Sequence, residues 1–166
     1  MTKLKLLHNK HFGLWWGLIL AAVIILFYRR LYLTWFQQDE WDWFGRYIYY
    51  NSQGQLPFVE AFKSSLFPHP RYRFTPLFDM FYAIQVYIFK LNFAHYATVS
   101  IILHFTNSLA FYYLTKKISG NTRIAMLASL FFATSSVGQK ATTWVFTSGN
   151  THTAALFSLL SLSKFV

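Results

Sequence analysis

Acidic side chains occur in one short stretch of this sequence, where they can act as proton acceptors. All five acidic residues lie between positions 39 and 79, and the densest group is the motif QQDEWDW, with Asp39, Glu40 and Asp42. A carboxylate at the mouth of a helix bundle can take a proton from an attacking hydroxyl. The alternative is a solvated loop in which Asp39 is the N-cap of a helix. On either interpretation we expect a helix over 40–50.

A basic stretch follows in the same segment and supplies the complementary charge. The run HPRYR at 69–73 contains Arg71 and Arg73. Arginine side chains bind phosphate through charge-assisted hydrogen bonds. Carboxylates and arginines at one membrane surface are the combination that chemistry on a lipid phosphate needs.

Composition indicates which elements must position these groups. The chain has 166 residues, of which 55% are hydrophobic and 12% charged, whereas soluble domains carry about 25% charged residues. Although the net charge is +10, Lys and Arg lie between long apolar runs, as topology determinants do. We therefore predict membrane insertion and no nucleic-acid binding. Cysteine is absent, which excludes disulfides and thiolate metal sites.

The apolar runs predict an all-α fold, a polytopic transmembrane helix bundle with interfacial helices in its first outer loop. A span needs about 20 apolar residues. The predicted spans are 12–36, 93–115, 124–140 and 151–166, and the outer loop is 37–92. The chain stops inside an apolar run, so we expect the N-terminal part of one larger transmembrane domain, inactive as an isolated piece.

The orientation follows from the basic residues between the predicted spans. The loop KKISGNTR carries three basic and no acidic residues, which predicts a cytoplasmic location. Leu77–Phe89 is apolar but has only 13 residues before Lys90, which is short for a span. With the N-terminus also in the cytoplasm, an even number of crossings must separate it from KKISGNTR. We therefore predict that Leu77–Phe89 lies in the outer interface.

The order of these features resembles the GT-C superfamily of glycosyltransferases that use polyprenyl-phosphate sugars. The matching stretches are FQQDEWDW, RYRFTPLF, ATVSIILHFTNSLAFYYLTKKISGNTRIAMLASLFFATSS and TTWVFTSGNTHTAALFSLLSL. They cover most of residues 30–163, and the likeness is greatest to protein O-mannosyltransferases and lipid A aminoarabinose transferases. The resemblance implies transfer of a sugar from a polyprenyl-phosphate donor to a hydroxyl acceptor, on a protein, lipid or glycan, at the outer face of the membrane.

The resemblance also implies roles for individual residues. Asp39 would be the general base, with Glu40 as the neighbouring candidate. Arg71 and Arg73 would hold the donor phosphate, because they precede an element similar to the family's Pro-Leu motif.

Other polar residues have two interpretations each. Arg30 either extends to the lipid headgroups or faces the donor phosphate. Many relatives have an acidic residue where this chain has Gly149-Asn150, so Asn150 and His152 are the candidates for a second polar site or acceptor contact. His104 and Asn107 lie one turn apart, and we expect them to hydrogen-bond to a neighbouring helix.

Two other function classes compete with the enzyme. They are a non-catalytic accessory membrane protein of the same fold, and a fragment of a transporter. Transporters place ionisable residues near the bilayer midplane, whereas here the acidic residues gather at one surface. No cofactor is firmly implied, although a divalent metal is possible. The expected partners are the lipid-linked sugar, the hydroxyl acceptor and membrane lipids, and the expected location is a bacterial inner membrane with the N-terminus in the cytoplasm.

Overall fold

The computed structural model describes residues 2–66 and 76–166, with the side chains of residues 2–12, 38–39, 136–137 and 146 left out. Within these residues all regular structure is helical, so the all-α prediction is confirmed. The elements are α1 Thr2–Tyr28, the 3₁₀ helix η1 Arg29–Leu33, α2 Gln38–Ser52, α3 Pro57–Leu66, α4 Pro76–Phe89, α5 Phe93–Ser119, α6 Thr122–Thr134, α7 Ser136–Thr143 and α8 Val145–Phe165.

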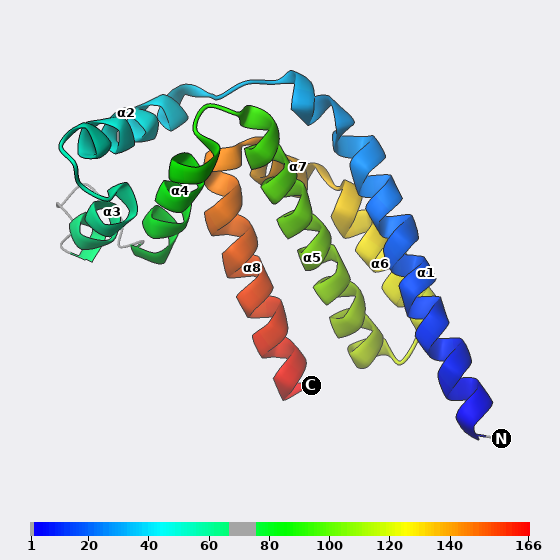
Figure 1. The fold of residues 1–166 in the computed structure, drawn as a ribbon. Helices are drawn as coiled ribbons and strands as arrows, with labels where there is room; N and C mark the ends of the chain where they lie inside the picture. The colour runs from blue at the N-terminus through cyan, green and yellow to red at the C-terminus, as the bar shows by residue number, and fades with distance from the viewer. Residues whose placement is uncertain (1, 67–75) are drawn as a thin grey trace.

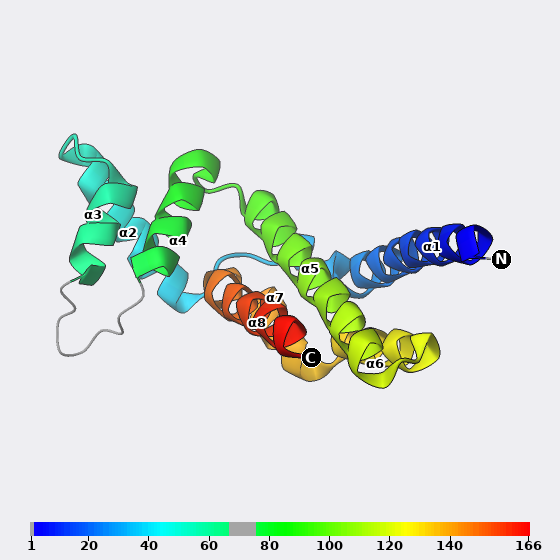
Figure 2. The same ribbon diagram turned by 90° about the horizontal axis from the view of Figure 1, so that it is seen from below.

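Four long helices, α1, α5, α6 and α8, lie side by side as a bundle (Figure 1). Helix α5 is central, because it packs against α6, α8 and α1. The start of α1, the α5–α6 turn and the end of α8 lie at one end of the bundle, whereas α2 runs across the other end (Figure 1). Helices α3 and α4 pack against each other beside the bundle, and the view from below separates them from α1 and α6 (Figure 2).

The turn between α5 and α6 is specified by its own residues. Gly120 adopts a left-handed conformation (φ 63°), and its N–H donates to the carbonyl of Lys116 at 3.0 Å. A glycine at this position ends a helix without the steric cost of a Cβ. The side chain of Asn121 then accepts from the N–H groups of Arg123 and Ile124 and so caps α6. The basic loop KKISGNTR is therefore a tight hairpin turn.

The helix bounds differ from the predicted spans in three places. The span 12–36 contains the second half of α1 and η1, and then an extended segment before α2. The span 124–140 is divided at Ser135 into α6 and α7. Helix α8 begins at Val145, six residues before the predicted 151. By contrast, the predicted helix over 77–89 corresponds to α4.

Helix α2 buries one side and leaves part of its aromatic surface exposed. Phe44 is buried, but Trp41 and Ile48, which share its face at helical spacing, are 45% and 61% exposed. The buried side of α2 instead runs through Glu40, Phe44 and Tyr47. The ring of Phe36, just before α2, lies 4.6 Å from that of Phe44 and 5.1 Å from that of Phe93. This aromatic cluster joins the start of α2 to the start of α5.

Much apolar surface is left outside the core. Among the described residues, one helix is long and apolar enough to cross a membrane: Gly13–Leu33, 21 residues of mean hydropathy 1.7. Only 28% of its most apolar window is buried, and Leu14, Trp15 and Leu26 are each more than 60% exposed. A helix in the core of a soluble protein would be covered on such faces. Composition, length and exposure thus agree with membrane association of this helix.

Candidate functional site

Glu40 lies at the start of α2, where it has a structural partner. Its side chain is 1% exposed, and its Oε2 accepts a hydrogen bond from the backbone N–H of Gln37 at 2.6 Å. The side chain of Gln37 in turn accepts from the Glu40 N–H, which completes a capping box. The helix N-cap is therefore Gln37, and the prediction that Asp39 is the N-cap is wrong. The side chain of Asp39 lies outside the described residues.

The carboxylate of Glu40 lies close enough to Tyr82 of α4 and Tyr96 of α5 for its charge to act on both phenols. The rings of Phe44 and Tyr82, from α2 and α4, are 6.3 Å apart, and that of Tyr96, from α5, is 6.2 Å from Tyr82. Burial raises the pKa of Tyr82, and the negative charge of Glu40 raises it further. The phenol of Tyr82 therefore stays protonated at physiological pH.

A second buried carboxylate lies in the same region, on α4. Asp79 is 6% exposed, and the hydroxyl of Tyr47 donates to its backbone carbonyl at 3.2 Å. Burial raises the pKa of Tyr47, with the charge of Asp79 as the next cause. The rings of Tyr47 and Tyr82 are 6.0 Å apart, so both carboxylates belong to one cluster between α2 and α4. We call Glu40, Tyr47, Asp79, Tyr82 and Tyr96 the acid–tyrosine cluster.

Sequence reasoning did not select Asp79, although one signal was available. It is an acidic residue in the first turn of a strongly apolar helix. At that position the helix dipole favours a negative charge.

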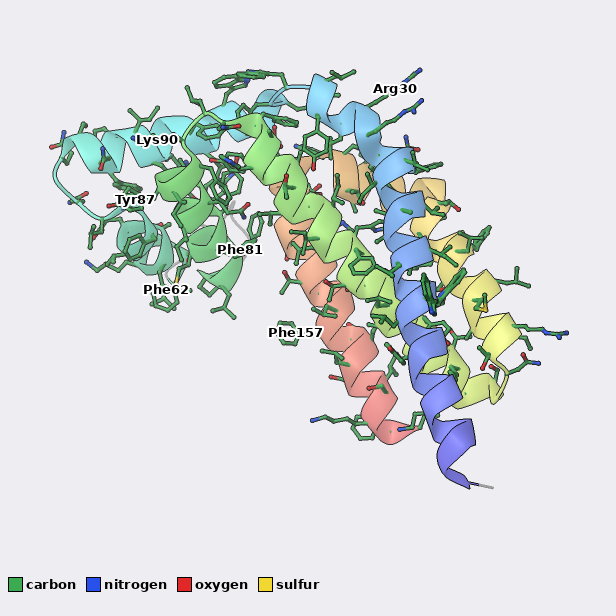
Figure 3. The ribbon with its side chains drawn as sticks, turned by 45° about the vertical axis from the view of Figure 1, so that its right-hand side comes forward. Arg30, Phe62, Phe81, Tyr87, Lys90 and Phe157 are labelled. Carbon is green, nitrogen blue, oxygen red and sulfur yellow. The ribbon has the colours of Figure 1, made fainter. Side chains whose placement is uncertain are left out.

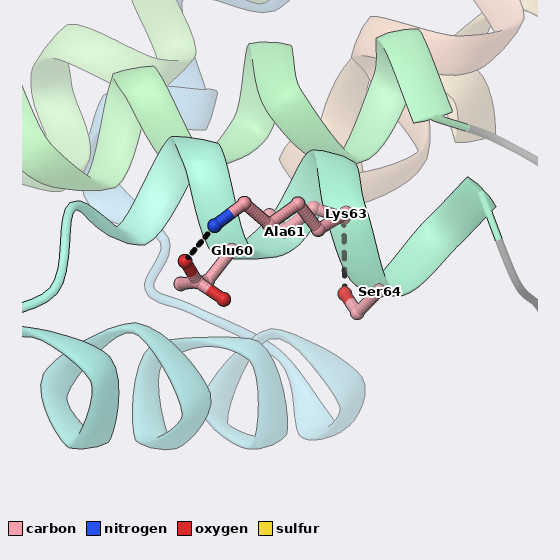
Figure 4. Close-up of polar contacts among 4 residues, drawn as sticks. All are labelled: Glu60, Ala61, Lys63 and Ser64. Atoms are coloured by element: carbon pink, nitrogen blue, oxygen red, sulfur yellow. Dashed lines mark hydrogen bonds and ion pairs between the residues drawn. The ribbon is translucent and has the colours of Figure 1, made fainter.

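The remaining described acids take part in ordinary surface ion pairs. Asp42 lies 3.5 Å from Arg46, with its side chain 71% exposed. Glu60 on α3 accepts from Lys63 at 2.9 Å, one turn along the same helix (Figure 4). Exposed pairs of this kind contribute little to stability. Among the described carboxylates, Glu40 and Asp79 are therefore the two that are buried.

Of the three basic residues predicted to bind phosphate, Arg30 is the one within the described residues. Arg71 and Arg73 lie outside the described residues. Arg30 is exposed in η1, and its side chain points away from α2 and α4 (Figure 3). Its position agrees with contact to headgroups rather than with a contact to Glu40.

The predicted second polar site is divided between surface and core. Asn150 is exposed, whereas His152 is 3% exposed. The two ring nitrogens of His152 lie 3.2 Å from the Asn107 amide nitrogen and 3.2 Å from the Thr142 hydroxyl. His152 is therefore enclosed by protein groups, and of the two only Asn150 is placed to meet an acceptor directly.

His152 belongs to a polar network in the middle of the bundle. Asn107 donates to the His152 carbonyl at 2.8 Å, and His104 bonds to the Ala133 carbonyl at 2.9 Å. The Ser100 hydroxyl lies 2.6 Å from that of Ser148. These contacts join α5 to α6 and α8 and confirm the expected role of His104 and Asn107. Such bonds between apolar helices contribute roughly 0.6–2 kcal/mol each.

In the part of the chain that the structure describes, no group of three or more His, Asp or Glu side chains is arranged to hold a metal ion. His104 and His152 are neighbours, with ring centroids 5.3 Å apart.

Comparisons with protein-family models, with curated proteins and with solved structures find no match to this chain.

Proposed function

We propose that this chain is the N-terminal part of a multi-pass membrane glycosyltransferase that transfers a sugar from a polyprenyl-phosphate donor to a hydroxyl acceptor. One observation carries the proposal. The described acids all lie on α2–α4, where Glu40 and Asp79 are buried beside tyrosines at the end of the bundle that α2 crosses. Buried ionisable groups at a membrane surface are costly and are usually kept for function.

The distribution of basic residues supports the orientation. Lys116, Lys117 and Arg123 flank the α5–α6 turn, and Lys164 lies in the last turn of α8 at the same end of the bundle (Figure 1). Basic residues gather on the cytoplasmic side of membrane proteins. The acid–tyrosine cluster then lies at the outer face, the side on which we place the transfer reaction, with the N-terminus in the cytoplasm of a bacterial inner-membrane protein.

In the proposed reaction Asp39 is the general base. The acceptor oxygen attacks the sugar's anomeric carbon, the bond from that carbon to the phosphate oxygen breaks, and polyprenyl phosphate leaves with the electron pair. The acceptor proton passes to Asp39. The Gln37–Glu40 capping box supports this role, because it fixes the backbone on both sides of Asp39 while occupying Glu40. The helix N-terminus also stabilises the carboxylate form of a base. Arg71 and Arg73 are proposed to bind the leaving phosphate.

The test is Asp39→Asn in membranes that contain the protein and are supplied with polyprenyl-phosphate sugars. Sugar transfer should fall roughly 10²–10⁴-fold, the usual contribution of a general base. Helicity should not change, because Asn keeps the shape of the side chain. Asp42→Asn is the matched control, since Asp42 is exposed and paired with Arg46, and its transfer rate should stay near that of the wild type.

One observation favours a second candidate, a non-catalytic accessory membrane protein of similar architecture. Glu40 already has a structural role, because it caps α2. An acidic motif that served only to stabilise the fold would show the same contact. Unchanged transfer in both Asp39→Asn and Glu40→Gln would favour that function. Loss of transfer in Glu40→Gln alone would instead make Glu40 the base.

A further inference from the structure

A cavity lies between α2, α3 and α4, next to the acid–tyrosine cluster, with which it shares Tyr47, and the proposed transfer reaction assigns it no role. Its volume is about 590 Å³, within the range of about 300–1,000 Å³ that is usual for small-molecule sites. Phe44 and Tyr47 from α2, Pro57 from α3 and Val86 from α4 are its buried lining residues. The interior is therefore almost entirely apolar.

The mouth of the cavity is also apolar, which is unusual for a surface that faces water. Ile48, Tyr87 and Leu91 line the cavity, yet they are 61%, 53% and 48% exposed. An exposed apolar rim around an apolar cavity indicates a hydrophobic ligand or a membrane contact.

Lys90 and Asn51 are the polar residues in this lining. Lys90 is exposed in the turn after α4, and no carboxylate is among the described residues that line the cavity. The Lys90 backbone has a left-handed conformation (φ 51°). Its N–H donates to the Val86 carbonyl at 2.9 Å, and its carbonyl accepts from the Tyr96 hydroxyl at 2.8 Å. The backbone of Lys90 is thus fixed at the rim, near α2, while Tyr87 lies further down α4 (Figure 3).

We propose that this cavity binds one acyl chain of an anionic phospholipid, whose phosphate contacts Lys90 and the Asn51 amide. An apolar interior with an apolar rim fits a hydrocarbon chain. A cation with no carboxylate beside it among the described lining residues selects a headgroup with a net negative charge. The lipid would hold α2, α3 and α4 together. The proposal rests on the membrane placement given above but not on sugar transfer.

The test is native mass spectrometry of the intact chain, purified in detergent and given equal amounts of phosphatidylglycerol and phosphatidylcholine. One phosphatidylglycerol should be retained in preference to phosphatidylcholine. Lys90→Gln should weaken its retention about fivefold, the effect of one basic residue near an anionic lipid surface. Ile48→Trp, which places a large ring at the rim, should reduce retention of both lipids.

Matched controls distinguish lipid binding at this site from a general attraction of anionic lipids to a basic protein. Lys63→Gln removes the same charge from α3 outside the cavity lining, and Tyr49→Trp enlarges an exposed residue of α2 that does not line it. Both should retain phosphatidylglycerol as the wild type does, and so should Asp39→Asn, which is directed at transfer alone. Equal retention of the two lipids by the wild type, or wild-type retention by either Lys90→Gln or Ile48→Trp, would overturn the proposal.

Discussion

At the scale of single residues, Glu40 combines a burial cost with a local hydrogen bond. A buried carboxylate is tolerated when it accepts hydrogen bonds in its charged form. The Gln37 N–H supplies one such bond, and the first turn of α2 adds a favourable dipole. The charge of Glu40 also acts on Tyr82. Burial is the main cause of the raised pKa of Tyr82, and this carboxylate raises it further. One side chain thereby couples the start of α2 to α4.

This coupling predicts that Glu40→Ala destabilises the fold. The Gln37 N–H would lose its partner, at a cost of about 1–2 kcal/mol for a lost cap. Glu40→Gln should cost less, because the amide oxygen can still accept that bond. The measurement is the thermal unfolding midpoint in detergent, followed by circular dichroism. Asp42→Ala, at an exposed surface pair, should change the midpoint little, and an equal loss in Asp42→Ala and Glu40→Ala would contradict the capping role.

At the scale of elements, the break between α6 and α7 has a tertiary cause. The last carbonyls of a helix lack partners within that helix, and His104 from α5 bonds to the carbonyl of Ala133. Gly138 in α7 leaves room for the same ring, since a Cβ there would lie 3.1 Å from the His104 Cε1. The chain therefore turns at Ser135 around a side chain from another helix.

The contact between α4 and α8 depends on a second glycine. A Cβ at Gly149 would lie 3.1 Å from two ring atoms of Phe81 and 3.5 Å from the ring of Phe78. Gly149→Leu should push the two helices apart and lower stability by about 1–3 kcal/mol, as overpacking does. Thermal unfolding in detergent measures the change.

The control for this prediction is Gly45→Leu in α2, where nothing lies within 4 Å of the added Cβ. That substitution should leave stability unchanged or raise it slightly, because Leu is a better helix former than Gly. If Gly149→Leu were equally harmless, the α4–α8 contact would be looser than its geometry indicates.

At the scale of the whole molecule, the two ends of the bundle differ in charge. The described acids lie on α2–α4 near one end, and the α5–α6 turn at the other end carries basic residues (Figure 1). This asymmetry predicts opposite membrane sides for Gln53, just after α2, and Ser119, at the end of α5.

Single cysteines at Gln53 and Ser119 test that topology, since the sequence contains no other cysteine. With a membrane-impermeant thiol reagent, Gln53→Cys should label in intact cells, and Ser119→Cys only after permeabilisation. Both residues are exposed, so a lack of label reports the membrane side rather than burial. Labelling of both from one side would mean that α4 crosses the membrane and that α2–α4 is not an outer unit.

The sequence by itself determined the features that depend on local composition. The apolar runs predicted the helical fold and the α4 segment, because helix formation there needs only a continuous apolar stretch of suitable length. The basic loop marked the α5–α6 turn, where the local conformations of Gly120 and Asn121 end one helix and begin the next. The confinement of the acids to 39–79 predicted the region of the candidate site.

Only the tertiary structure decided which residues of that region act together. Gln37 rather than Asp39 caps α2, because the buried Glu40 reaches back to the Gln37 N–H. Asp79 joins the cluster through Tyr47, 32 positions earlier in the chain. His104 ends α6 from a different helix, and His152 is enclosed rather than open to an acceptor. Each of these depends on contacts between segments far apart in sequence, and local composition and periodicity carry no information about such contacts.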